Sequence, residues 1–219
     1  MNTTAAIDQA PSERSRVRRA EDRGHYDRAT IHAIVDAAYL CHVSFVDERG
    51  PLCLPTAVWR IDDHVLIHGS NGSKMMKSLA QGTPACLAIT HLDGLVMARS
   101  AFSHSMNFRS VVVHGAFEPV PDGEKTEVMH RLMDHLAPGR RDEARAPDRN
   151  ELAATTVLSL PLFEAAAKIR AWGPKDKEED LDWPVWAGVL PFAQSRTAPR
   201  PEATNPPGTP AYVARWNRV

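Results

Sequence analysis

The pattern of apolar and polar positions along the middle of the chain is mostly that of β-strands. Apolar residues alternate with polar ones, or form short continuous runs, between stretches of turn residues. Strands are predicted over residues 40–46, 52–59, 65–68, 85–90, 95–100, 109–117 and 155–160. The segments 85–90 and 95–100 flank Asp93-Gly94, where we expect a turn.

Three segments have the spacing of helices instead. Asp27 is placed to cap the first, over residues 27–38, which carries its apolar residues on one face. Residues 73–80 predict a short second helix and residues 124–136 a third. The segment 165–172 is ambiguous, because its alanines favour a helix while the glycine-proline pair that follows allows only a short element of either type.

These elements are predicted to form one domain, residues 25–194, between two segments of different composition. Residues 1–24 are polar and rich in arginine, which predicts a flexible arm or a segment draped over the surface. Residues 195–219 contain five prolines, a density that excludes a helix or a central strand. Tyr212 and Trp216 near the end of this proline-rich tail are apolar groups able to dock on the domain.

The expected fold class is mainly β with flanking helices. Antiparallel hairpins favour a closed barrel over a sandwich with exposed edges, and the chain lacks the strand–helix rhythm of a parallel nucleotide-binding sheet. The net charge of −1 points to neither nucleic acid nor an anionic membrane as a partner. Without an apolar signal sequence or a membrane-length apolar run, we expect a cytoplasmic protein.

The three cysteines are expected to be buried free thiols. Cys41, Cys53 and Cys86 each lie in an apolar, strand-like run, and no two of them form a C-x-x-C pair. Free thiols accord with a reducing compartment. The histidines show no metal-binding spacing, so no metal site is predicted.

The segment from His68 to Lys74 is a candidate phosphate cradle. A predicted strand ends at Gly69, small residues follow, and Lys74 begins a helix. Backbone N–H groups of such a turn can approach an anion, Ser70 and Ser73 add hydroxyl donors, and Lys74 adds a positive charge. The alternative is an ordinary strand-to-helix turn with a solvated lysine.

Two further segments carry candidate binding residues. The loop and strand over residues 98–111 are rich in polar groups, where Asn107 and Ser110 can bind the edge of a heteroaromatic ring and Arg109 a phosphate or carboxylate. The alternative is a capped, solvated turn. Trp186, in residues 183–191, is either an anchor of a core or interface, or an aromatic ring beside a planar cofactor.

Together these segments resemble the pyridoxamine 5'-phosphate oxidase-like, FMN-binding split-barrel proteins, and in particular their flavin-nucleotide-binding branch. The matching stretches are His25-Tyr26-Asp27, Ile67-His68-Gly69-Ser70, residues 98–111, Lys168-Ile169-Arg170 and residues 186–191. The resemblance implies a six-stranded antiparallel split β-barrel. It also implies a homodimer with FMN at the dimer interface.

The resemblance also assigns the cofactor-binding residues. The strand Thr56, Ala57, Val58 and Trp59 would lie along the isoalloxazine ring, and the segment His68, Gly69, Ser70, Ser73 and Lys74 would hold the ring edge and the phosphate. In the segment Arg109-Ser110-Val111, Ser110 would reach the flavin of the partner subunit. Trp186 matches a late aromatic residue near the flavin.

Departures from the oxidases argue against pyridoxamine phosphate as the substrate. The oxidases carry two positive charges where this chain has only Arg60, and an Arg-Lys pair where it has Lys74 alone. Near Trp186 the chain has no match for their substrate-phosphate arginine, and Ser103 and Phe108 replace the histidine and tyrosine of the narrower branch. We therefore expect an FMN-dependent oxidoreductase that acts on another small molecule.

The sequence does not assign a catalytic residue, and three further functions stay open. His68 and His104 are candidate proton donors or acceptors, but neither has a visible partner in the sequence. A haem-binding or haem-degrading split barrel would use one of the histidines as an axial ligand. A deazaflavin-dependent reductase on the same fold is the second, and a flavin carrier or sensor without turnover is the third.

Overall fold

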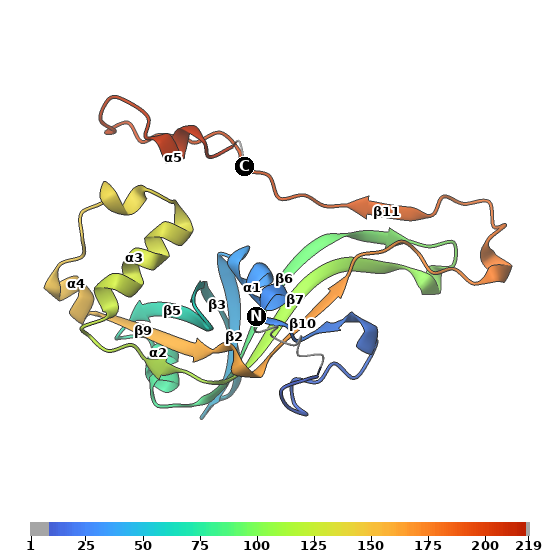
Figure 1. Cartoon of the computed structure of the whole chain (residues 1–219), viewed down its shortest axis with the longest axis horizontal. Coiled ribbons are helices and arrows are strands. Elements are labelled where there is room, and N and C mark those ends of the chain that lie inside the picture. Colours follow the sequence, from blue (N-terminus) through green and yellow to red (C-terminus); the bar gives the residue numbers. More distant parts are fainter. Residues whose placement is uncertain (1–8, 218–219) are drawn as a thin grey trace, which may run out of the picture.

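The computed structural model describes residues 9–217, which form a β-barrel with a long projecting arm and a returning tail (Figure 1). The strands are β1 (Gly24–His25), β2 (Leu40–Asp47), β3 (Gly50–Ala57), β4 (Trp59–Ile61), β5 (His64–Ser70), β6 (Pro84–Met97), β7 (Ser105–Ala116), β8 (Glu118–Pro119), β9 (Thr155–Pro161), β10 (Ala165–Arg170) and β11 (Gly188–Pro191). The helices are α1 (Arg28–Asp36), α2 (Lys74–Ala80), α3 (Lys125–Leu136), α4 (Arg149–Ala153) and α5 (Ala211–Ala214).

The strands of residues 9–217 form two antiparallel sheets. The larger has seven strands, in the order β1-β10-β7-β6-β2-β3 with β11 added to β6, and the smaller has the order β4-β5-β9-β8. The mainly β, split-barrel class predicted from the sequence is confirmed, although the strand count is higher than six. Val58 alone separates β3 from β4, so the chain passes from one sheet to the other at that residue.

Two apolar clusters stabilise the barrel. The main core lies between the sheets and α1, where Val35, Val43 and Val111 have no exposed surface. The second lies between the smaller sheet and α3, around the fully buried Trp59 and Leu132. Because both faces of the smaller sheet are covered, β4 and β5 hold their side chains in fixed positions.

Local capping explains where two predicted helices begin. The Asp27 carboxylate accepts the Thr30 N–H at 2.8 Å at the start of α1. The Ser73 hydroxyl accepts the Met76 N–H at 3.4 Å at the start of α2. Each bond satisfies one of the N–H groups that a helix leaves free at its beginning.

The predicted turn at Asp93-Gly94 is wrong, because β6 runs through it as one long strand. The register against β7 shifts between Leu92 and Gly94, so the irregularity is a bulge within the strand and not a reversal. The first half of β6 pairs with β2 and the second half with β11. A continuous β6 and its partner β7 make the arm that leaves the barrel in Figure 1.

The structure also settles the ambiguous segment and corrects the cysteine prediction. Residues 165–170 form strand β10, which pairs with β7 and so has its backbone groups satisfied by the sheet. All three cysteines are free, but only Cys41 is buried, while Cys86 is partly exposed and Cys53 exposed. Burial raises the pKa of the Cys41 thiol to about 12.

The two terminal segments lie against the rest of the chain where they are described. In the N-terminal segment, predicted to be flexible or draped over the surface, the Val17 N–H donates to the Tyr26 hydroxyl at 2.9 Å. Residues 1–8 of this segment lie outside the described residues. The tail runs back from the arm toward α3 (Figure 1), and Arg196 donates to the Tyr39 hydroxyl at 2.9 Å. The prediction that this tail contains no helix is wrong, because the short helix α5 forms after the last proline, Pro210. No helix in residues 9–217 has the length and apolar character that a membrane crossing requires.

Candidate cofactor site

Strand β3 forms a free edge of the larger sheet beside the smaller one. It pairs with β2 along its whole length and, within residues 9–217, has no strand on its other side. Pro51 and Pro55 lie in β3, and since proline lacks an N–H, their presence fits an edge strand. Among the residues predicted to lie along a flavin ring, Thr56 and Ala57 are partly exposed on this edge.

The other two residues of that predicted set face the core. Val58 is 1% exposed and Trp59 is 0% exposed. The Val58 side chain packs in the main core and the Trp59 side chain in the cluster under α3, so only their backbone groups can meet a ligand.

The turn between β5 and α2 has the donors that an anion site needs. The Ser70 hydroxyl oxygen accepts the Gly72 N–H at 3.1 Å, and the Ser73 oxygen accepts the Met76 N–H. Both hydroxyl protons are left to donate to a ligand. Lys74 is exposed, and within residues 9–217 no carboxylate oxygen lies within 4.0 Å of its amine.

Asn71 fixes this turn to the end of the smaller sheet. Its amide nitrogen donates to the Ala153 carbonyl at 2.6 Å, and its amide oxygen accepts the Thr156 hydroxyl at 2.7 Å. Gly69 is required for packing, since a Cβ there would lie 2.9 Å from Met76 Cγ. The predicted cradle is thus a turn held by two Asn71 hydrogen bonds, with hydroxyl donors that residues 9–217 do not use.

His68 precedes this turn and has an unsatisfied ring nitrogen. The ring stands edge-on to Trp59, with the ring centroids 5.7 Å apart. Its Nδ1 is buried and has no hydrogen-bond partner in the described part of the chain. Burial lowers the pKa of His68, so the neutral imidazole is favoured.

The predicted polar residues of the arm are held by contacts within the chain. Asn107 is buried and accepts a hydrogen bond from Arg170, and Arg109 donates to Asp93 at 2.9 and 2.8 Å. Ser110 donates to the Lys168 carbonyl at 3.3 Å. The Val111 side chain lies in the main core.

The two halves of the predicted site are not brought together within one chain. Figure 1 shows the arm leading away from β5 and α2. Asn107, Arg109 and Trp186 lie on or beside the arm, whereas residues 68–74 lie at the far side of the barrel. A single chain therefore presents the two groups separately.

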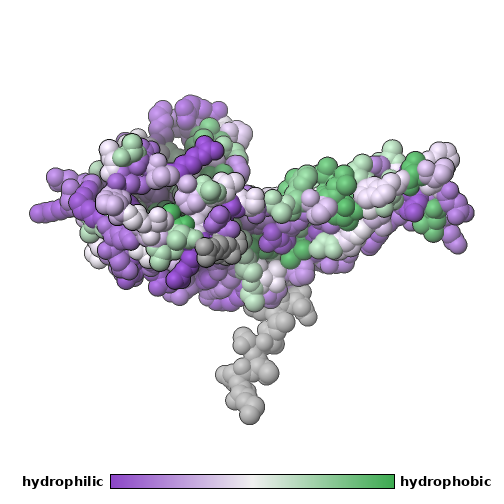
Figure 2. Space-filling model, turned by 90° about the horizontal axis from the view of Figure 1, so that it is seen from above, coloured by the Kyte–Doolittle hydropathy of each residue, from purple (hydrophilic) through white to green (hydrophobic). Residues whose placement is uncertain are grey.

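One face of the arm is apolar and exposed. The β-ladder places Leu190 beside Leu95, and Leu95 beside Met106; these residues are 45%, 37% and 50% exposed. Trp186, two residues before β11, is 63% exposed. Figure 2 shows this concentration of hydrophobic residues along the projecting arm.

The opposite face of the arm is covered. Val96 and Asn107 point to that side, where they are 0% and 8% exposed. β11 approaches the arm closely at Gly94, where a Cβ would lie 2.8 Å from the Leu190 carbonyl oxygen. The arm is therefore a sheet with one covered face and one exposed apolar face.

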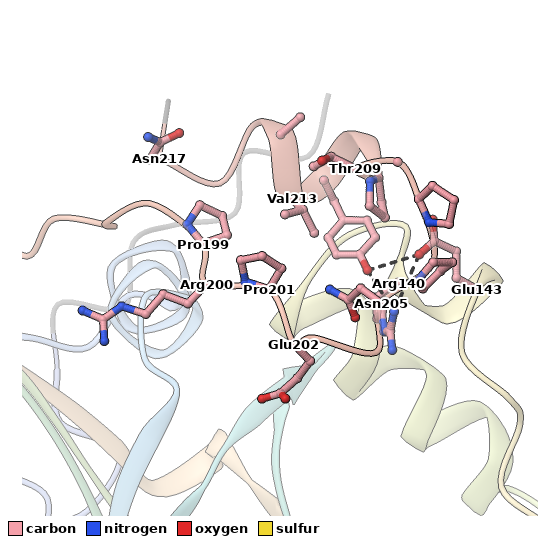
Figure 3. Close-up of a pocket in the computed structure, with 16 residues that line it drawn as sticks. Arg140, Glu143, Pro199, Arg200, Pro201, Glu202, Asn205, Thr209, Val213 and Asn217 are labelled. Atoms are coloured by element: carbon pink, nitrogen blue, oxygen red, sulfur yellow. Dashed lines mark hydrogen bonds and ion pairs between the residues drawn. The ribbon is translucent and has the colours of Figure 1, made fainter.

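A cavity of about 1050 Å³ lies elsewhere, under the tail (Figure 3). Its walls are mostly tail residues. The Tyr212 hydroxyl accepts a hydrogen bond from Arg140 at 3.0 Å and donates to Glu143 at 3.2 Å. The cavity contains none of the predicted cofactor-binding residues, so it is separate from the candidate site.

Sequence reasoning missed a group of cations at the base of the arm. Arg23, Arg170 and Lys175 surround the ring of Trp172. Arg170 and Lys175 flank Trp172 in the sequence, which is a visible signal, but Arg23 comes from the N-terminal segment. Only the fold brings Arg23 to them.

Comparisons with known proteins agree with this architecture. The sequence profile of the pyridoxamine 5'-phosphate oxidase family matches residues 27–169. The flavocytochrome Anf3 from Azotobacter vinelandii is 37% identical, with a TM-score of 0.90, over 95% of this chain and 98% of its own. The FAD and haem binding protein from Mycobacterium smegmatis is 35% identical, with a TM-score of 0.85, over 89% of this chain and 97% of its own. The search of curated proteins finds no match.

Proposed function

The chain belongs to the pyridoxamine 5'-phosphate oxidase family, and on that premise we propose that it is a redox protein that binds both a flavin and a haem. The observation that carries this proposal is the extent of the similarity to two proteins named for such cofactors. Those similarities cover 95% and 89% of this chain, whereas the family profile ends at residue 169. The similarity to both relatives therefore extends beyond the residues that the family profile matches.

The β5–α2 turn is the proposed site of the flavin phosphate. Ser70 and Ser73 have hydroxyl protons free to donate, and Lys74 supplies an exposed positive charge. The edge at Thr56 and Ala57 provides a surface along which a planar ring can lie. When bound, a flavin supplies transfer of hydride or electron pairs and a haem supplies one-electron transfer. The residues of this chain bind and orient the two groups.

The sequence predicts FMN, and the Mycobacterium smegmatis relative is named for FAD. FAD and FMN share the ring and the first phosphate, so the β5–α2 turn suits both. We favour FAD because the similarity to that relative extends over 89% of this chain. FMN is the second candidate.

Among the histidines bonded to backbone carbonyls, His104 is best arranged to bind iron. Its Nδ1 lies 3.0 Å from the Ser100 carbonyl oxygen, which can only accept, so Nδ1 carries the proton. This leaves the Nε2 lone pair free, the arrangement usual for metal-binding histidines. His91 and His135 use Nε2 for their own carbonyl bonds, at 3.0 and 2.9 Å. We therefore propose that His104 would hold the haem through Nε2.

We also propose that the protein works as a homodimer with its cofactors at the interface. The exposed apolar face of the arm at Leu95, Met106 and Leu190 is suited to a second copy of the chain. A partner's arm would supply the second half of the flavin site, including Ser110 and Trp186. Free cysteines accord with the cytoplasmic location that we expect.

Release of the cofactors from purified protein tests the flavin assignment. We expect acid denaturation to release FAD near one per chain, identified by its mass, together with haem b. Release of FMN alone would replace FAD by the second candidate. A protein that releases no flavin, and takes up neither FAD nor FMN when supplied, would contradict the proposal.

A further inference from the structure

Trp172 lies at the base of the arm, where it is surrounded by positive charge. The guanidinium carbons of Arg23 and Arg170 lie 5.2 and 5.1 Å from the centre of the Trp172 ring, and the Lys175 amine lies 5.2 Å from it. These residues come from three places in the sequence: the N-terminal segment, the end of β10 and the loop that follows β10. A cation–π contact explains why any one of these cations lies beside the ring, but not why three of them gather there.

The cluster has no negative partner in the part of the chain that the structure describes. None of its three cations has a carboxylate oxygen within 4.0 Å. The nearby Asp176 carboxylate is already used by Arg99, which donates its backbone N–H at 2.8 Å and its side chain at 3.0 Å. Like charges held this close repel one another unless an anion compensates them.

Several N–H donors of the cluster are also unsatisfied. Arg23 Nε, Arg170 Nε and Trp172 Nε1 are buried and have no hydrogen-bond partner within residues 9–217. Arg170 is only 3% exposed, and its other donors reach neutral acceptors: the Asn107 side chain and the carbonyls of Trp172 and Gly173. Buried donors without partners are costly, so their convergence on one ring calls for an acceptor.

Burial has the electrostatic effect expected of such a cluster. Desolvation lowers the pKa of Arg170, and repulsion from Arg23 lowers it further. Lys175 is exposed, and Arg23 and Trp172 are partly exposed, so the cluster opens to solvent on one side. An oxyanion entering there would neutralise charge and accept a hydrogen bond from the exposed Lys175 amine.

We propose that Arg23, Arg170, Lys175 and Trp172 form a second anion-binding site, which takes a phosphate or carboxylate group of a bound cofactor. This inference rests on the proposed function, because a flavin dinucleotide carries a pyrophosphate and a haem carries propionates. The shared chemistry is an oxyanion on a large planar cofactor. The site is distinct from the β5–α2 turn, which lies on the far side of the barrel.

Rates of cofactor release from the holoprotein test the site and distinguish the two anions. The variants are Arg23→Gln and Lys175→Met. The matched controls are Arg19→Gln and Lys177→Met, which remove exposed charges near the cluster but outside it. Released flavin is followed by its rise in fluorescence, and released haem by its transfer to apomyoglobin.

Loss of one charge-assisted hydrogen bond should speed release on the order of tenfold or more. Faster flavin release alone assigns the site to the pyrophosphate, and faster haem release alone assigns it to a propionate. Lys175→Arg, which keeps the charge, should release both cofactors at the wild-type rate. Release rates equal to those of the controls, even with a lowered melting temperature, would show that the cluster only stabilises the fold.

A second measurement covers the case in which the purified protein holds neither cofactor and takes up no FAD, FMN or haem when these are supplied. The proposed function then fails, but inorganic pyrophosphate still probes the anion site directly. Pyrophosphate should raise the melting temperature of the wild type and both controls above that in sodium chloride of equal ionic strength, and should not raise it in Arg23→Gln or Lys175→Met. An equal rise in all five proteins, or no rise in any, would overturn the site itself.

Discussion

Arg109 and Asp93 form a two-point ion pair across the base of the arm. Arg109 donates from Nε and Nη2 to the two carboxylate oxygens of Asp93, at 2.9 and 2.8 Å. The pair joins β7 to the bulge in β6, where the register between the strands shifts. It therefore holds the arm in register, and it occupies a guanidinium that the sequence had marked as a phosphate ligand.

This pair should make stability depend on pH. The hydrogen bonds from Arg109 lower the pKa of Asp93, so the pair stabilises the fold above the ordinary aspartate pKa of about 3.9 and loses that effect as pH falls through the lower folded pKa. Because both side chains are about a third or more exposed, we expect Asp93→Asn to cost only about 0.5–1 kcal/mol at pH 7. Urea unfolding from pH 7 to pH 3 measures this cost.

The cost should stay constant down to about pH 4.5 and shrink below about pH 4. Asp182→Asn, at an exposed position, is the control and should unfold like the wild type. An Asp93→Asn cost that does not change with pH would mean that the ion pair is not its source.

Gly94 should be essential for β11. A Cβ at Gly94 would lie 2.8 Å from the Leu190 carbonyl oxygen and 3.0 Å from Pro191 Cα, both of them backbone atoms. Gly94→Ala should therefore detach β11 and speed hydrogen exchange of residues 188–191, whereas Gly123→Ala, with nothing within 4 Å, should not. Unchanged exchange in Gly94→Ala would show that β11 can shift to make room.

The apolar face of the arm should control assembly. Leu95→Glu replaces a central residue of that face with a charge that a dimer would bury, so we expect dimer affinity to fall by about 2–4 kcal/mol, or roughly 30- to 1000-fold. Sedimentation across a range of concentrations measures this. Leu136→Glu, on α3 and away from the arm, is the control. A wild type that sediments as a monomer with cofactors bound, or a Leu95→Glu that dimerises normally, would remove the proposed interface.

His104 should be required for the haem and not for the flavin. His104→Ala removes the only carbonyl-bonded histidine in residues 9–217 whose Nε2 lone pair is left free. We expect the purified variant to lose its haem absorption while it keeps its flavin. His64→Ala, at another exposed histidine, should keep both cofactors. A normal haem content in His104→Ala would show that another histidine, such as His42 or His68, holds the haem.

Features with a local cause could be predicted from the sequence. Asp27 caps α1 as expected, and α2 forms where residues 73–80 predicted a helix, because a cap and a short helix depend only on residues a few positions apart. The strand alternation also gave the barrel class. The turn predicted at Asp93-Gly94 is wrong because an aspartate-glycine pair is typical of both a turn and a β-bulge. Gly94 also lets β11 pair with β6, and this contact joins residues far apart in the sequence, so local pattern did not reveal it.

The site was less predictable for the same reason. The sequence marked candidate donors by residue type, but it could not show which of them are already bound within the chain. Arg109 is bound to Asp93, and Asn107 is bound to Arg170, 63 residues away. Arg23 reaches Trp172 only through the fold. Contacts between distant residues decided which polar groups remained for a ligand.

The absorption spectrum of the purified protein tests the central proposal most directly. A chain that binds a flavin and a haem should show flavin bands near 450 nm on the side of a much stronger Soret band, and denaturation should release the two cofactors in about equal amounts. A spectrum with neither band, unchanged after FAD and haem are supplied, would contradict the proposal. So would a spectrum with a deazaflavin band in place of both.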